Sequence, residues 1–105
     1  MSGLSAVVAI IQARMTSSRL PGKVLVDIEG KTTLQRMIER TGQAKTVSSI
    51  VVATTTNTTD DPIAEAACEM KTKVFRGDEA DVLGRIAGAA REFDATVVVR
   101  LTADC

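Results

Sequence analysis

Hydrophobic residues along this chain follow two alternating patterns, short continuous apolar runs and longer segments with an apolar residue every three or four positions. The runs cover residues 6–11, 50–54, 73–76 and 96–101. Continuous runs of this length, rich in β-branched residues, are typical of strands covered on both faces. A helical pattern separates each strand from the next, so the order β-α-β-α-β-α-β predicts a parallel sheet with right-handed crossovers.

The first helical segment carries signals at both of its ends. Thr32 followed by Gln35 matches a capping box at the start, and Gly42 suits a helix stop. Before this helix, residues 24–28 are expected to form a short extended piece closed by a turn at 29–30. One helix face is mostly apolar and consists of Leu34, Met37, Ile38 and Thr41.

The second and third helices are predicted to begin at acidic residues. Asp60, Asp61 and Pro62 open the second, with proline in the first turn and acids near the positive end of the helix dipole. Residues 78–81 start the third. The expected inward faces are Ile63, Ala66, Ala67 and Met70, then Val82, Leu83, Ile86, Ala90 and Phe93.

Together these elements predict an α/β fold, a three-layer Rossmann-like sandwich with a mainly parallel sheet. Ligands of such sheets bind beyond the carboxyl ends of the strands. The segments that gather there are 12–23, 54–60 and 102–105. No repeat or linker divides the chain, so residues 1–105 are expected to belong to one domain. The stop three residues after a strand suggests an apparently truncated sheet.

Composition restricts the class of protein. Of the 105 residues, 45% are hydrophobic and 25% charged, which is ordinary for a globular chain. The sequence shows no signal peptide and no apolar stretch near the roughly 20 residues that span a bilayer, so a cytoplasmic location without membrane contact is expected. Residues 1–59 carry a net charge of +4 and residues 60–105 one of −4. This asymmetry suggests an early anion-binding loop and a late metal-binding element, or only scattered solvated charge.

Scarce residue types exclude several functions. The only aromatic residues are Phe75 and Phe93, which disfavours base stacking and hence binding of single-stranded nucleic acid. Without histidine, no Ser-His or Cys-His relay can form. Cys68 and Cys105 alone cannot make a structural zinc site. Cys68 is expected to be a small buried residue within a helix.

The polar segment 12–23, which follows the first strand, carries most of the candidate chemistry. Several fixed cations suit a nucleoside triphosphate, which has roughly four negative charges, because arginine binds phosphate bidentately and lysine adds a mobile charge. Neither the spacing of a P-loop nor G-x-G-x-x-G is present. A merely basic surface loop is the alternative. The residues suited to an anion are Arg14, Ser17, Arg19, Gly22 and Lys23.

The sequence I-Q-A-R-M-T-S-S-R-L-P-G-K at 11–23 resembles the signature loop of the cytidylyltransferase family, which includes synthetases of CMP-activated sugar acids. Glutamine at position 12, where many members have proline, is similar to the branch named for spore coat polysaccharide biosynthesis protein F. Segments 50–61, 74–85 and 99–104 resemble later parts of that branch. The resemblance covers nearly the whole chain but only the first half of the family's domain.

The resemblance implies roles for individual residues. It implies nucleotide contacts for Ser17, which would support the loop or a phosphate oxygen, and for Gly22. The other residues that it places around the nucleotide are Gln12, Ala13, Thr54, Thr55 and Arg76. It implies that Asp104 is a ligand of Mg²⁺, although Ala103 stands where the family usually has glycine and a turn-forming aspartate is the alternative. The residues implied to act on the phosphates, and so in catalysis, are Arg14, Arg19 and Lys23.

Other acidic positions have competing interpretations. Asp81 and Arg85, four residues apart, are expected to form a surface ion pair, with a role near the nucleotide as the alternative. Asp60 and Asp61 are expected to cap a helix.

The function that the resemblance implies is transfer of CMP from CTP to a sugar acid or related sugar, with release of pyrophosphate, in surface or spore-coat polysaccharide biosynthesis. The expected partners are CTP, Mg²⁺ and a small sugar, with a homodimer in a full-length form and no nucleic acid. The 105 residues alone are expected to be inactive. Two alternatives stay open, use of another nucleoside triphosphate and a non-catalytic module that binds nucleotide or sugar phosphate.

Overall fold

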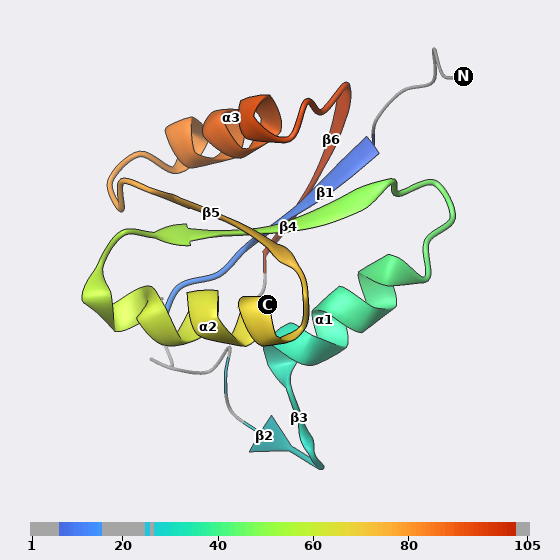
Figure 1. Cartoon of the computed structure of the whole chain (residues 1–105), viewed down its shortest axis with the longest axis vertical. Helices are drawn as coiled ribbons and strands as arrows, with labels where there is room; N and C mark the ends of the chain where they lie inside the picture. The colour runs from blue at the N-terminus through green and yellow to red at the C-terminus, as the bar shows by residue number, and fades with distance from the viewer. Residues whose placement is uncertain (1–6, 16–24, 26, 103–105) are drawn as a thin grey trace.

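The protein, in a computed structural model that describes residues 7–15, 25 and 27–102, is built around one parallel sheet (Figure 1). Its strands lie in the order β5-β4-β1-β6, and every neighbouring pair is parallel. All four strands predicted from the apolar runs are present within a residue or two of the expected bounds. They are β1 (Val7–Gln12), β4 (Ser49–Thr55), β5 (Lys73–Gly77) and β6 (Val97–Thr102).

Helices cover both faces of the sheet, so the predicted three-layer sandwich is confirmed. Figure 1 shows α1 (Thr33–Gly42) and α2 (Asp61–Glu69) on one face and α3 (Val82–Glu92) on the other. The chain runs from β1 outward through β4 to β5 and then returns to β6 on the other side of β1. Because the strand order reverses between β1 and β6, this is the place where such sheets usually bind ligands.

The central strand β1 is buried on both faces, as its continuous apolar run predicted. Ile11 packs into the layer formed with α1 and α2, whereas Val8 and Ile10 pack into the layer that contains α3. Each buried aliphatic side chain contributes about 1.5–3 kcal/mol to stability. The strand register is therefore fixed by burial on both sides, since a slip of one residue would exchange the two faces.

The start of α1 confirms the predicted capping box. The hydroxyl of Thr32 accepts a hydrogen bond from the Gln35 backbone N–H at 3.0 Å, and the Gln35 side chain accepts one from the Thr32 N–H at 2.9 Å. Leu34 and Ile38 form the buried side of the helix. Gly42 is the last helical residue, in agreement with its predicted role as a stop.

Ahead of α1 the structure contains a small hairpin of which only one arm was predicted. Strand β2 (Asp27–Ile28) pairs with the antiparallel strand β3 (Lys31–Thr32). The turn at Glu29 and Gly30 has φ angles of 56° and 90°, which are the two consecutive left-handed positions of a tight hairpin turn. The predicted turn is confirmed, while the return strand was missed.

Helix α2 follows a short 3-10 turn, η2 (Thr58–Asp60), and begins with Pro62 in its first turn as expected. Its inward face is also as predicted, since Ile63 and Ala67 are buried. The prediction that Cys68 is buried is wrong, because this thiol is exposed. One helical residue corresponds to a rotation of about 100°, so Cys68 turns away from the sheet when Ala67 faces it.

Helix α3 begins after Asp81, whose carboxylate accepts a hydrogen bond from the Gly84 N–H at 2.8 Å. The helix was predicted, but its expected inward face is partly wrong, because Leu83 is 72% exposed. The buried positions are Arg85, Gly88 and Ala89. Within the described residues no helix has the length and apolar character needed to cross a membrane.

Candidate functional site at the carboxyl edge of the sheet

The loops that follow β1, β4 and β5 meet at the carboxyl edge of the sheet. Strand β1 ends at Gln12, which is paired in register with Ala53 of β4 on one side and with Thr102 of β6 on the other. Thr55 of β4 is in turn paired with Gly77 of β5. The described parts of segments 12–23 and 54–60 therefore lie side by side, as the parallel sheet predicted.

The first residues after β1 remain tied to the sheet. Gln12 and Ala13 are 8% and 4% exposed, and the Ala13 N–H donates to the carbonyl of Ala53 at 3.0 Å. Arg14, directly after them, has a side chain that is 33% exposed. The structure thus presents the first cation of the predicted loop at the surface, on a backbone fixed by its neighbours.

Arg14 is held loosely by an acidic residue of the β5–α3 connection. One guanidinium nitrogen lies 3.7 Å from a carboxylate oxygen of Glu79, whose side chain is 49% exposed. The other oxygen of Glu79 accepts a hydrogen bond from the Asn57 side-chain amide at 2.8 Å. Glu79 therefore joins all three loops, and the exposed ion pair itself contributes at most about 1 kcal/mol.

Arg76 is engaged with the β4–α2 connection. Its Nε donates to the carbonyl of Thr55 at 2.7 Å, and Nη2 donates to the carbonyl of Asn57 at 2.9 Å. The same Nη2 lies 2.9 Å from Asp61 Oδ1. These contacts give Arg76 a clear role in shaping the loop after β4. Its predicted contact with a nucleotide stays a prediction.

The two threonines at the end of β4 are fully buried. The Thr55 hydroxyl donates to Oδ2 of Asp60 and also accepts a hydrogen bond from the Asn57 N–H at 3.1 Å. The Thr54 hydroxyl makes no hydrogen bond within the described part of the chain. Both threonines lie at the carboxyl edge of the sheet. Their predicted position near the base or ribose of a nucleotide stays a prediction.

Asp60 occupies the expected helix-start position but does not act as the predicted cap. Among the described residues its side chain makes no capping hydrogen bond to α2. Its carboxylate is fully buried and instead accepts the Met15 backbone N–H at 2.7 Å, in addition to the Thr55 hydroxyl. Asp61 pairs with Arg76 rather than capping the helix through its side chain.

The predicted surface ion pair between Asp81 and Arg85 is wrong. Arg85 is only 3% exposed, and its Nη1 donates to the carbonyls of Asp78 and Glu79, each at 2.9 Å. Burial lowers the pKa of the Arg85 guanidinium, and the positive charge of Arg14 lowers it further. Arg85 therefore stabilises the β5–α3 connection through the carbonyls of Asp78 and Glu79. Asp81 caps α3 instead.

Several predicted site residues lie outside the described residues and stay predictions. No group of three or more His, Cys, Asp or Glu side chains that could hold a metal ion occurs in the part of the chain that is described. The predicted residues outside the description are Ser17, Arg19, Gly22, Lys23 and Asp104.

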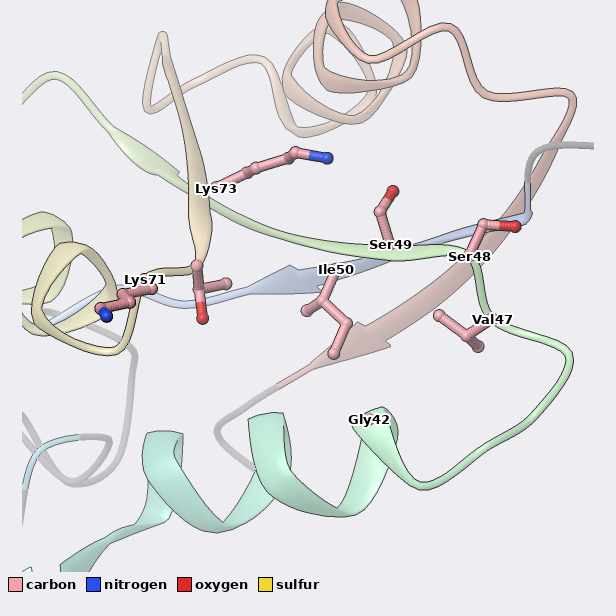
Figure 2. Close-up of a pocket in the computed structure, with 8 residues that line it drawn as sticks. Gly42, Val47, Ser48, Ser49, Ile50, Lys71 and Lys73 are labelled. Atoms are coloured by element: carbon pink, nitrogen blue, oxygen red, sulfur yellow. The ribbon is translucent and has the colours of Figure 1, made fainter.

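A separate cavity of about 320 Å³ lies at the opposite end of the sheet, near the amino ends of β4 and β5. Figure 2 shows that the side chains of Lys71 and Lys73 point away from one another, so their charges do not converge on a common ligand. Lys73 instead places its ammonium 5.6 Å from the ring centre of Phe93. This cavity has none of the predicted site residues in its lining.

Sequence reasoning missed Asn57, Glu79 and the hydrogen bonds that join Asp60 to Met15 and Thr55. The available signal was their position, because each follows a strand at the carboxyl edge. Contacts across 45 residues, as between Met15 and Asp60, leave no local pattern in a sequence.

The fold and this edge define a class, an α/β protein whose polar loops meet at the switch point of a parallel sheet. The family model described as cytidylyltransferase matches residues 8–105. The chain therefore belongs to the cytidylyltransferase family, whose members are nucleotidyltransferases, and the predicted resemblance is confirmed.

Similar proteins agree with this membership. The spore coat polysaccharide biosynthesis protein SpsF of Bacillus subtilis is 41% identical over 100 residues, which cover 90% of this chain and 41% of SpsF. A cytidylyltransferase structure from Leptospira borgpetersenii has a TM-score of 0.91 and 39% identity, covering 97% of this chain and 43% of that one.

A CMP:2-keto-3-deoxy-manno-octonic acid synthetase, solved in complex with CTP, superposes with a TM-score of 0.81 and 32% identity. The match covers 95% of this chain and 41% of that one. The chain thus spans about two fifths of the length of the relatives that it matches.

Proposed function

We propose that this chain is the CTP-binding part of an enzyme that transfers CMP from CTP to a sugar acid or a related sugar, with release of pyrophosphate. The pathway that we propose is biosynthesis of a surface or spore-coat polysaccharide. Family membership supports the reaction class. The names of SpsF and of the CTP-bound synthetase support the pathway and the nucleotide.

The observation that carries this proposal is the position of the signature loop. Residues 13–15, with which the loop begins, leave β1 beside the point where the strand order reverses, and its first cation, Arg14, is partly exposed there. The exposed pair with Glu79 is worth at most about 1 kcal/mol, whereas a hydrogen bond between charged groups contributes about 1.5–3 kcal/mol. A phosphate would therefore replace Glu79 on Arg14 at little cost.

The proposed chemistry requires charge stabilisation more than covalent work by the protein. A sugar hydroxyl would attack the α-phosphorus of CTP in line, its proton would pass to water, and the bond to the leaving pyrophosphate would break. Arg14, Arg19 and Lys23 would offset the negative charge that collects on the β- and γ-phosphates as pyrophosphate departs. The chain has no histidine, and this scheme does not need a histidine base.

We further propose that Mg²⁺ binds with Asp104 as its protein ligand. Most of the coordination would come from phosphate oxygens and water, as is usual for this ion. When bound, the ion would neutralise charge on the phosphates. The roles assigned above to Arg14, Arg19 and Lys23 do not depend on it.

A non-catalytic module that binds nucleotide or sugar phosphate is the alternative to this enzyme. Release of pyrophosphate from CTP, measured with candidate sugar acids on a protein that contains the complete domain, separates the two functions. Turnover would support the enzyme, and binding of CTP without turnover would support the module.

Nucleotide choice can be tested by thermal unfolding of the chain with CTP, UTP, GTP or dTTP. A ligand at about 100 times its Kd stabilises the folded state by about 2.7 kcal/mol, which corresponds to a rise in Tm of roughly 10 °C or more for a domain of this size. We expect CTP to give the largest rise. Equal effects of all four nucleotides, or no effect, would contradict the proposal.

The matched pair of variants for this test is Arg14→Gln and Arg91→Gln. Both remove one arginine charge, but Arg91 is exposed in the last turn of α3, far from the carboxyl edge. We expect the CTP-induced rise in Tm to shrink in Arg14→Gln and to persist in Arg91→Gln. An equal loss in both would show that the effect is only net charge.

A further inference from the structure

A fully buried carboxylate connects the loop after β1 with the loop after β4. Asp60 has no exposed surface. One of its oxygens accepts the backbone N–H of Met15 at 2.7 Å, and the other accepts the hydroxyl of Thr55. The first of these contacts spans 45 residues of sequence and ends one residue after Arg14.

Burial of an acidic side chain is unfavourable unless hydrogen bonds compensate for lost hydration. A cap on α2 would be the ordinary reason to keep an aspartate at this position, but the Asp60 side chain makes no such bond in the described residues. Both observed partners instead lie at the carboxyl edge of the sheet. The carboxylate is therefore used to join two loops rather than to start a helix.

The bond to Met15 is stronger than the contact that holds the neighbouring Arg14 side chain. The Arg14 side chain pairs with Glu79 at 3.7 Å in a partly exposed position. By contrast, the Met15 N–H meets a buried carboxylate oxygen at 2.7 Å, and hydrogen bonds to charged acceptors are about twice as strong as neutral ones. Asp60 thus restrains the backbone, whereas Glu79 only restrains the side chain.

We infer that Asp60 is a positioning residue of the nucleotide site, which acts by fixing the Met15 backbone and so the place from which Arg14 reaches a phosphate. This inference rests on the proposed function. A backbone that is ordered before the ligand arrives binds more tightly, because the ordering entropy is not lost on binding. Loss of the restraint at one residue would weaken nucleotide affinity by roughly tenfold.

The test compares three variants of the whole chain, Asp60→Ala, Asp60→Asn and Val51→Ala. Val51 is fully buried in the layer next to α3, away from Met15, so its truncation lowers stability without touching the loop. For each variant we would measure hydrogen exchange of the Met15 amide without nucleotide, and the Kd for CTP by calorimetry. Both measurements are made well below every Tm.

We expect Asp60→Ala to speed exchange at Met15 and to raise the Kd for CTP about tenfold. In Asp60→Asn, the exchange rate at Met15 and the Kd for CTP should both lie close to the wild-type values, because the amide oxygen can still accept the Met15 N–H. Val51→Ala should lower Tm but leave exchange at Met15 and the Kd as in the wild type. This pattern would distinguish positioning from a general loss of stability.

Three results would overturn the inference. The first is a Kd in Asp60→Ala equal to that of the wild type, and the second is a Met15 amide that exchanges at the wild-type rate in that variant. The third is a loss of CTP affinity in Val51→Ala as large as that in Asp60→Ala, when each variant is measured equally far below its own Tm. In each of these cases wild-type binding of CTP would leave the proposed function intact, whereas a wild-type chain that does not bind CTP would overturn both.

Discussion

Among single residues, Gly88 shows how closely α3 approaches the sheet. A Cβ atom at this position would lie 2.5 Å from Cζ of Phe75 and 2.9 Å from its Cε2. The Phe75 ring lies in the layer between β5 and α3, together with Val51 and Ala89. The helix therefore needs a glycine where it packs on the Phe75 ring. The ring fills the space that a side chain at position 88 would otherwise occupy.

We predict that Gly88→Ala destabilises the protein. Over-packing typically costs about 1–3 kcal/mol, which outweighs the gain of roughly 0.5–1 kcal/mol from replacing glycine with alanine in a helix. The midpoint of urea unfolding should fall. Gly42→Ala is the control, because its Cβ would lie 3.8 Å from Ile50 Cδ1, an ordinary contact. A Gly88→Ala variant as stable as Gly42→Ala would show that Phe75 moves aside freely.

At the scale of elements, α1 depends on its first turn. The Thr32 and Gln35 pair satisfies two backbone N–H groups at the start of a helix of only 10 residues. Helices of this length are marginal in isolation, so the cap and the buried residues Leu34 and Ile38 must act together.

We predict that Thr32→Ala lowers the free energy of unfolding by about 1 kcal/mol, since it removes the acceptor for the Gln35 N–H. Thr46→Ala, at an exposed position after α1, should change it by less than about 0.5 kcal/mol. Chemical denaturation of the two variants measures the difference. Equal stabilities would mean that water replaces the Thr32 hydroxyl without loss.

Most elements were predictable because their buried residues form continuous apolar runs in the strands and recur every three or four positions in the helices. The four strands and three helices were found from apolar runs and helical spacing, whereas β3 was missed because a strand of two residues carries no period. The face of α3 was misassigned at Leu83, which is exposed. Ile86, Ala90 and Phe93 do pack against the core as predicted, but the small residues Gly88 and Ala89, which the spacing of large side chains does not indicate, are the buried ones.

The edge of the sheet at which the described candidate residues lie was predictable, but the contacts that they make were not. The loop at the end of β1 and the threonines of β4 were assigned to the correct edge of the sheet. The contacts of Asp60 and Arg85 were not, because an aspartate before a helix suggests a cap and a four-residue spacing suggests an ion pair. Tertiary contacts replaced both local preferences.

At the scale of the whole molecule, β6 is an edge strand among the described residues and is the part of their sheet with the most exposed apolar surface. Val97, Val98 and Val99 are 45%, 38% and 37% exposed, although they belong to a strand that pairs with the central β1. An edge strand offers unpaired backbone groups to another chain, and exposed valines add an apolar contact. This edge is thus the surface on which self-association would begin.

We predict that the chain self-associates at high concentration through β6 and that Val97→Lys reduces this association, because a charged lysine on an edge strand opposes pairing with a second copy. Leu83→Lys is the matched control, since Leu83 is 72% exposed but belongs to α3. Sedimentation velocity over a concentration series measures both. If apolar exposure alone drove association, Leu83→Lys would have the larger effect, because Leu83 is the more exposed residue; a larger effect of Val97→Lys would assign the association to backbone pairing at the sheet edge.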